Sequence, residues 1–349
     1  MEEIQNTEST SPDSSIGCIN CSNPVVVKGF PNALCETCRD NYIKFPIPLW
    51  VKAFTIGIGI IFLFSLYKLP PNIASGVHLE KGKIAMEQKK YLTAQKELQK
   101  VADILPNNLE AQGTLLIAAF NNQDWVTLNK AYTVLLNKKF DDEDLYDKVN
   151  RTVQDANAYY PKDSFTSIMQ HYGNDINKVP INILKNYVDS NKDDLSATTS
   201  YAGLLLNTGS NYAVADSVLT NILATNPEYI PALSAISSLK RQENKLDESI
   251  EYCNKILFYN SESVYGLASK ARTYLKQKRN DEAYKLAMQS YQLNNKDMYA
   301  IATVILAANF SNKIKERDDM LQKALTLKDS ADADVLQYAQ DVIKGKEKF

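Results

Sequence analysis

Residues 82–108 read "GKIAMEQKKYLTAQKELQKVADILPNN", and residues 203–229 read "GLLLNTGSNYAVADSVLTNILATNPEY". The two stretches share five residue types in one register: a glycine, a tyrosine nine residues later, an alanine after three more, a leucine after four more and a proline after eight more. Helical periodicity alone does not produce five such matches. We therefore interpret the two stretches as copies of one structural unit.

The pattern continues along the chain in equal steps of about 34 residues, a period typical of helical repeat arrays. One step from Tyr91 leads to Trp125, and successive steps from Ala215 lead to Ser249 and Ala283. Small residues let helices approach, and large residues fill the space between units. This pattern resembles the tetratricopeptide repeat (TPR) family, which implies an all-α solenoid of about 6–7 helix pairs. In this register, units begin near residues 75, 109, 196, 230, 264 and 298.

The rest of the chain differs from the repeats in composition. We expect a disordered leader at 1–16, a four-cysteine module at 17–42, a transmembrane helix at 49–67, TPR-like repeats at 76–142, an irregular helical region at 143–195, TPR-like repeats at 196–331, and a closing helix and tail at 332–349. The segment "KLPPNIASG", residues 68–76, is expected to break the helix after the apolar run, because proline disrupts helices.

The apolar run at 49–67, "LWVKAFTIGIGIIFLFSLY", has one charge, Lys52. At about 1.5 Å per residue it is long enough to cross the hydrocarbon core of a bilayer. Trp50 and Tyr67 lie where interfacial aromatic residues are expected. A signal peptide would start closer to the N-terminus, and a buried core helix would normally have a polar face. We therefore expect a single-pass membrane anchor.

Four of the five cysteines form the pattern C-x2-C-x13-C-x2-C, with Cys18, Cys21, Cys35 and Cys38 as its members. Two such pairs supply the four thiolates of a closed, structural zinc site. The segment resembles zinc-ribbon and treble-clef modules, with a small hairpin at "VVVKGFPN" and a short helix starting in "CETCRDNYIK". Two disulfides, an iron site or a redox pair are the alternatives.

The zinc hypothesis also bears on membrane orientation, because basic residues are balanced on the two sides of the apolar run. Thiolate zinc sites persist most readily in a reducing cytoplasm. We therefore expect the zinc module in the cytoplasm and the repeats outside it.

The resemblance to TPR proteins implies a concave groove lined by the first helix of each unit. A protein or peptide partner would bind there, with arginines meeting its acidic groups; the alternative is an ordinary scaffold surface. The residues expected to face the groove are Asn207, Arg241, Tyr265, Arg272, Lys276, Tyr299, Asn309 and Phe310.

Composition argues against several other functions. A formal charge of −2 and the lack of a basic stripe disfavour a nucleic-acid partner. With only two histidines, His78 and His171, and Cys253 expected in a packing position, no catalytic set converges, so we expect neither an enzyme nor a small-molecule substrate. The sequence favours a membrane-anchored scaffold for assembling a protein complex. The alternative is a sensory protein that couples partner binding to the zinc module.

Overall fold

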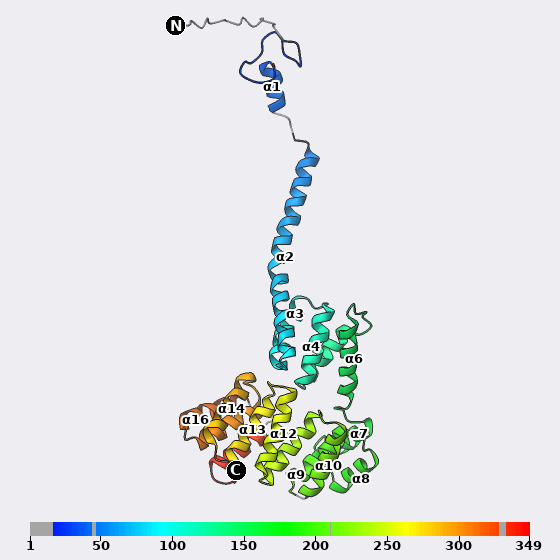
Figure 1. Cartoon of the computed structure of the whole chain (residues 1–349), viewed down its shortest axis with the longest axis vertical. Coiled ribbons are helices and arrows are strands. Elements are labelled where there is room, and N and C mark those ends of the chain that lie inside the picture. The colour runs from blue at the N-terminus through cyan, green and yellow to red at the C-terminus, as the bar shows by residue number, and fades with distance from the viewer. Residues whose placement is uncertain (1–16, 44–46, 210, 328–332) are drawn as a thin grey trace, which may run out of the picture. The chain divides into compact units, whose positions relative to one another are not determined.

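The computed structural model describes residues 17–43, 47–209, 211–327 and 333–349. Within these ranges the regular secondary structure is entirely helical (Figure 1), which confirms the expected all-α class. The disordered leader predicted at 1–16 lies outside the described residues. The chain divides into two compact units, Met1–Pro70 and Pro71–Phe349, and each is described below by itself.

The first unit contains the four-cysteine segment, the short helix α1 (Glu36–Ile43) and most of helix α2 (Leu49–Glu87). The expected break at 68–76 is wrong, because α2 continues through Pro70 and Pro71. Proline's fixed φ is compatible with a helix, although the residue removes one hydrogen bond to the preceding turn and its ring crowds the carbonyl four residues earlier. Among the described residues that follow α2's start, the first with a left-handed φ is Lys89, beyond the helix's end.

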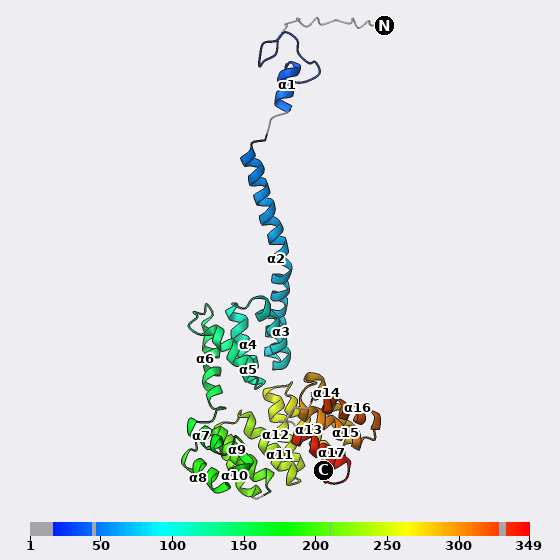
Figure 2. The ribbon, with the colours of Figure 1, turned by 180° about the vertical axis from the view of Figure 1, so that it is seen from behind.

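The second unit begins with the last part of α2 and forms a solenoid-like series of helices, seen from two sides in Figures 1 and 2. They are α3 (Tyr91–Ile104), α4 (Leu109–Asn121), α5 (Trp125–Leu135), α6 (Glu143–Asn157), α7 (Asp163–His171), the 3-10 helix η1 (Ile176–Lys178), α8 (Ile181–Ser190), α9 (Leu195–Asn207), α10 (Tyr212–Thr225), α11 (Ile230–Gln242), α12 (Leu246–Tyr259), α13 (Val264–Lys276), α14 (Asn280–Leu293), α15 (Met298–Phe310), α16 (Ile314–Leu327) and α17 (Ala333–Ile343).

The helices of this unit recur at the interval found in the sequence. Helices α10, α12, α14 and α16 begin at positions 212, 246, 280 and 314, which are equally spaced. Helices α11, α13 and α15 begin at positions 230, 264 and 298 with the same spacing, and each packs against the helix that follows it. The solenoid of TPR-like helix pairs is therefore confirmed as the fold class.

Five helix pairs within the described residues are closed by the same turn. At Lys278, φ is +62°; its N–H donates to the carbonyl of Leu275 and the next N–H donates to the carbonyl of Tyr274, both at 2.9 Å. These two bonds define the Schellman motif, which normally uses glycine at the left-handed position. The same pair of bonds and a positive φ occur at Lys89, Gln123, Asn244 and Asn312.

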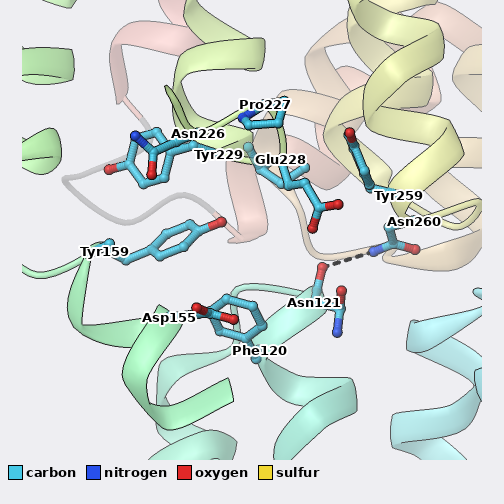
Figure 3. Close-up of a pocket in the computed structure, with 12 residues that line it drawn as sticks. Phe120, Asn121, Asp155, Tyr159, Asn226, Pro227, Glu228, Tyr229, Tyr259 and Asn260 are labelled. Atoms are coloured by element: carbon cyan, nitrogen blue, oxygen red, sulfur yellow. Dashed lines mark hydrogen bonds between the residues drawn. The ribbon is translucent and has the colours of Figure 1, made fainter. Parts of the chain in front are cut away.

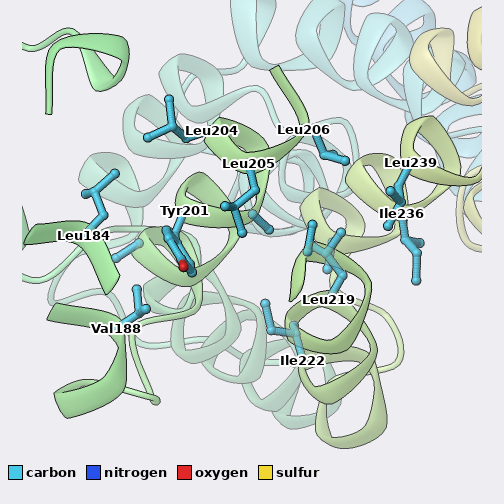
Figure 4. Packing of buried hydrophobic residues seen from close by; sticks show 14 of the residues in the cluster. Leu184, Val188, Tyr201, Leu204, Leu205, Leu206, Leu219, Ile222, Ile236 and Leu239 are labelled. Carbon is cyan, nitrogen blue, oxygen red and sulfur yellow. The ribbon is translucent and has the colours of Figure 1, made fainter. Parts of the chain in front are cut away.

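The core lies between successive pairs. In Figure 4, leucines and isoleucines of α9, α10 and α11 interdigitate, among them Leu205, Leu219 and Ile236. The small residues at the repeat positions are fully buried, including Ala215 and Ser249. The Ser249 hydroxyl donates to the carbonyl of Ser237 at 2.8 Å, so its burial leaves no unpaired hydroxyl.

The first helices of the second unit also touch its middle, across about half of the chain. The N–H of Ser261 donates to the carbonyl of Lys89 at 3.0 Å. Thr93 donates from both its N–H and its hydroxyl to the Glu262 carboxylate, each at 2.7 Å. We call these polar contacts between α3 and the α12–α13 loop the fold-back contact. The repeat pattern did not predict it.

Candidate functional site

The four cysteines of the N-terminal pattern converge on one point. Their Sγ atoms all lie within 4.8 Å of one another. Cys18, Cys35 and Cys38 are buried, whereas Cys21 is exposed. The cluster is compatible with a single metal ion, since four thiolates are the donor set of a closed zinc site.

Tight turns hold the sulfurs in place. The N–H of Ser22 donates to the carbonyl of Cys18 at 2.8 Å, and Ser22 has a left-handed φ of +58°. In the second pair, the N–H of Cys38 points at the sulfur of Cys35, 3.5 Å away. Such N–H groups stabilise thiolates and leave the sulfurs free to face a common ion.

The expected hairpin is present only as a loose loop. The N–H of Ile19 donates to the carbonyl of Ala33, and the N–H of Val27 donates to that of Leu34, each at 2.9 Å, yet no strand forms among residues 17–43. Two bonds are too few for a ladder of paired strands. The hairpin predicted from the "VVV" run is therefore wrong. The short helix expected at the second cysteine pair is α1.

The thiols influence one another electrostatically. The N–H groups near Cys18, that of Cys35 above all, lower the pKa of its thiol to about 6. For Cys21 the N–H of Asn23 acts in the same direction, but the sulfurs of Cys38, Cys35 and Cys18 outweigh it and raise the pKa to about 12. A cation at the centre would offset the repulsion between neighbouring thiolates, because a metal ion favours the deprotonated form of each thiol that coordinates it.

Four of the eight predicted groove residues meet in one cluster. The rings of Tyr265 and Tyr299 stack with centroids 5.0 Å apart and an interplanar angle of 17°. The Arg272 guanidinium lies over the Tyr299 ring, 3.9 Å from its centroid. Arg241 donates to the hydroxyl of Ser269 at 2.9 Å. We call Arg241, Tyr265, Arg272 and Tyr299 the arginine–tyrosine cluster.

This cluster has positive charge without a counter-charge. Arg272 is only 7% exposed and donates from Nε to the Thr303 hydroxyl at 2.8 Å, while its Nη2 has no hydrogen-bond partner. Among the described residues, no carboxylate forms an ion pair with either arginine. Burial acts to raise the pKa of Tyr299, but the two guanidinium groups outweigh it and lower that pKa.

The other predicted groove residues lie at different places. Lys276 is 5.5 Å from the ring centroid of Phe349, which in turn packs against Phe310 at 5.3 Å. The oxygen of the Asn309 side chain accepts a hydrogen bond from Arg317 at 3.1 Å, and Asn207 is exposed at the end of α9. Sequence reasoning did not identify Ser269 and Thr303, although both belong to the groove-lining helices α13 and α15.

Helix α2 is the one helix of the described residues that is long and apolar enough to cross a membrane. Its most apolar 18-residue window has a mean hydropathy of 2.0, and none of that window is buried by protein. Length and composition make it a candidate span.

Neither a family model nor a curated protein matches the sequence. Among solved structures, pilF of Pseudomonas aeruginosa is 14% identical, and the match covers 77% of this chain and 99% of that chain at a TM-score of 0.30. Yeast Tom70 is 12% identical, and the match covers 73% of this chain and 60% of that chain at a TM-score of 0.37. At these scores the likeness supports no argument, so the class rests on helix bounds and contacts: an all-α helical-repeat protein with a four-cysteine cluster.

Proposed function

We propose that this chain is a membrane-anchored, non-enzymatic scaffold that binds an acidic protein segment at the arginine–tyrosine cluster. The observation that carries the proposal is the buried Arg272, which has an unpartnered Nη2 and no ion pair among the described residues. A guanidinium removed from water without a counter-ion is unfavourable. A carboxylate from a partner would supply the missing charge with well-matched geometry.

The neighbouring groups favour a carboxylate over an apolar ligand. Arg241 is partly exposed, and its guanidinium is fixed by the hydroxyls of Ser269 and Ser238. Burial lowers the pKa of Lys276, and the positive charge of Arg241 lowers it further, so the two cations repel each other. An incoming carboxylate would relieve that repulsion, so binding energy would come from charges already held in position.

The anchor in this proposal is the apolar part of α2. Its large side chains, such as Phe54, Ile60 and Leu63, are exposed along the whole 49–66 stretch. Exposure of this much apolar surface to water is unfavourable, whereas lipid tails would cover it. Assigning the four-cysteine cluster to structural zinc would put that module in a reducing cytoplasm and the repeats on the other side.

The partner proposal is tested with the full-length protein in detergent micelles. The probe is a pool of blocked peptides that contain Glu or Asp, compared with matched peptides in which Gln or Asn replaces them. We expect the acidic peptides to bind and the Arg241→Gln/Arg272→Gln variant to bind them at least tenfold more weakly. The matched control is Arg151→Gln, since Arg151 is an exposed arginine of α6. Equal binding of the amide peptides, or unchanged binding by the double variant, would refute the proposal.

Zinc is tested on the same full-length protein by elemental analysis. We expect one zinc ion per chain, and none in the Cys21→Ser/Cys38→Ser variant. Cys253→Ser is the control, because Cys253 is a buried thiol of α12 in the second unit, whereas the four-cysteine cluster belongs to the first unit. Iron in place of zinc, or metal retained by the double variant, would contradict this assignment.

A further inference from the structure

A second candidate site lies beside the fold-back contact. A cavity of about 250 Å³ opens between the end of α4, the end of α6, the α10–α11 loop and the end of α12 (Figure 3). We call it the junction cavity. Its lining includes two carboxylates and four aromatic rings: Phe120, Asp155, Tyr159, Glu228, Tyr229 and Tyr259. Asn260, at its edge, donates to the carbonyl of Asn121 at 3.1 Å, so the cavity spans both sides of the fold-back region.

Aromatic rings make up much of the cavity wall. The Tyr159 ring lies 5.3 Å from that of Phe120 and 4.7 Å from that of Tyr229, measured between centroids. Trp125 packs 5.2 Å from Tyr159 and fixes it from another direction. The face of an aromatic ring carries negative electrostatic potential, so a wall that contains several rings can attract a cation.

The charge of the cavity is negative. Asp155 and Glu228 line it, and none of its described lining residues is a lysine, arginine or histidine. Figure 3 shows the Glu228 carboxylate directed into the space between Tyr159 and Asn260. Burial, together with the charges of Asp155 and Glu228, raises the pKa of Tyr159 to about 12. The tyrosine hydroxyl therefore stays neutral, and the two carboxylates set the field in the cavity.

We propose that the junction cavity binds a single organic cation, either a guanidinium or an ammonium group. Aromatic faces and carboxylates together form the usual recognition site for such groups. A volume of about 250 Å³ lies just below the usual range for ligand pockets, which suits one side-chain-sized group rather than a bulky cofactor. This site is separate from the arginine–tyrosine cluster and opposite to it in charge.

Binding would also strengthen the fold-back contact. The cation would touch residues on both sides, since Phe120 and Tyr159 precede the C-terminal repeats and Glu228 and Tyr259 belong to them. A ligand that binds only when both sides are in place stabilises that arrangement by mass action. Hydrogen exchange at residues 258–262 should therefore slow when the cation is present.

The experiment uses full-length protein in detergent and three probes: blocked arginine (N-acetyl-arginine methylamide), blocked lysine and tetramethylammonium. Binding is measured by equilibrium dialysis, and exchange at 258–262 by mass spectrometry. N-acetyl-citrulline methylamide is the neutral isostere of the arginine probe. We expect at least one cation to bind and the citrulline probe not to bind. Stronger binding of the blocked amino acids than of tetramethylammonium would identify a side chain of a partner, and the reverse order a free small molecule.

The variant Asp155→Asn/Glu228→Gln removes the two carboxylates from positions that are exposed, so the fold should be retained. We expect its affinity for the cation to fall about tenfold. The charge-matched control is Glu251→Gln/Asp319→Asn, at exposed positions of α12 and α16. Tyr159→Leu, which keeps most of the apolar volume, should weaken binding several-fold by removing the π face.

Three results would overturn the proposal: equal binding of the citrulline probe, unchanged affinity in the carboxylate variant, or no binding of any cation at millimolar concentration. The Arg241→Gln/Arg272→Gln variant should bind the cations normally. Failure of this proposal is thereby separable from failure of the acidic-partner proposal.

Discussion

Helix α15 and the 49–66 part of α2 are both apolar on all sides, but only α15 is covered by other helices of the described residues. In α15, "MYAIATVILAANF", ten residues are buried, from Met298 to Ala308, by α13, α14, α16 and α17. In the 49–66 part of α2, the large apolar side chains stay exposed, with Leu63 66% accessible. Composition alone does not distinguish the two. The two segments differ in whether other helices cover them. A covered apolar helix is stable in water, whereas an uncovered one needs an apolar surrounding.

The largest expected difference in stability between the two helices comes from placing a lysine in each. Ile305 is fully buried, so Ile305→Lys buries an unpaired charge, and we expect the second unit to unfold. Ile60→Lys should leave unfolding of that unit unchanged, while membrane insertion becomes less favourable by about 3 kcal/mol. Thermal denaturation and vesicle flotation measure the two effects.

The expected contrast would be contradicted if Ile60→Lys lowered the melting temperature of the repeats as much as Ile305→Lys does. That result would mean that the apolar part of α2 is covered by protein in solution. Ile305→Val is an apolar control that removes one methylene group, for which we expect a loss of about 1 kcal/mol of unfolding free energy.

The next effect is the truncation of one leucine in each helix. Leu306 is fully buried in the core around α15, and Leu306→Ala should lower the free energy of unfolding by about 2–5 kcal/mol. Leu63→Ala should change it by less than about 0.5 kcal/mol, because Leu63 is exposed. Urea unfolding followed by circular dichroism gives both values, and similar losses would contradict the contrast.

A smaller difference in unfolding free energy is expected when a glycine in each region, Gly266 or Gly59, is replaced by alanine. A Cβ at Gly266 would come within 2.9 Å of Ile256 and 3.2 Å of Leu257, so Gly266→Ala should destabilise the repeats by about 1–3 kcal/mol. At Gly59 a Cβ would meet nothing within 4 Å, and alanine has the higher helix propensity. We expect Gly59→Ala to leave unfolding of the repeats unchanged. A stabilised Gly266→Ala variant would show that α12 and α13 are less tightly packed than described.

The smallest effect concerns the start of α15. The Asp297 carboxylate accepts a hydrogen bond from the N–H of Ala300 at 2.8 Å and caps the helix. Asp297→Ala should cost about 1 kcal/mol of unfolding free energy, and Asp297→Asn, which can still cap, should cost less. At the start of α2 the carbonyl of Pro48 accepts from the N–H groups of Val51 and Lys52, so Pro48→Ala keeps these bonds. Equal losses for Asp297→Ala and Asp297→Asn would show that the cap contributes little.

Much of the fold could be predicted from the sequence, because its cause is local and periodic. Small residues recur once per repeat where two helices cross. Ala215, Ser249 and Ala283 are examples, and all three are fully buried. The cysteine spacing likewise predicted that the four sulfurs would converge. The identity of any ion remains a prediction, because the spacing fixes the geometry and not the metal.

Three features of the structure could not be predicted from the repeat pattern, because they do not recur along the sequence. The passage of α2 through Pro70 and Pro71 shows that a helix can continue where a rule about proline alone predicts its end. Part of the fold-back contact joins Lys89 to Ser261 through backbone groups, which almost any residue type supplies; the rest uses the side chains of Thr93 and Glu262. In the candidate groove, the positions of the arginines were predictable, but their partners Ser269 and Thr303 depend on the side-chain directions of neighbouring helices.

The Schellman turns have a consequence for how such a chain can grow. Each turn closes with bonds confined to one short stretch, such as 274–279, and the left-handed position accepts lysine and glutamine as well as asparagine. The angle between paired helices is therefore encoded within each unit, independent of the total number of units. A duplication of one whole repeat inserted beyond residue 293 would carry its own turn and extend the array. The fold-back contact, which uses residues up to 262, would be untouched, so gene duplication could lengthen the helical array without changing the rest of the chain.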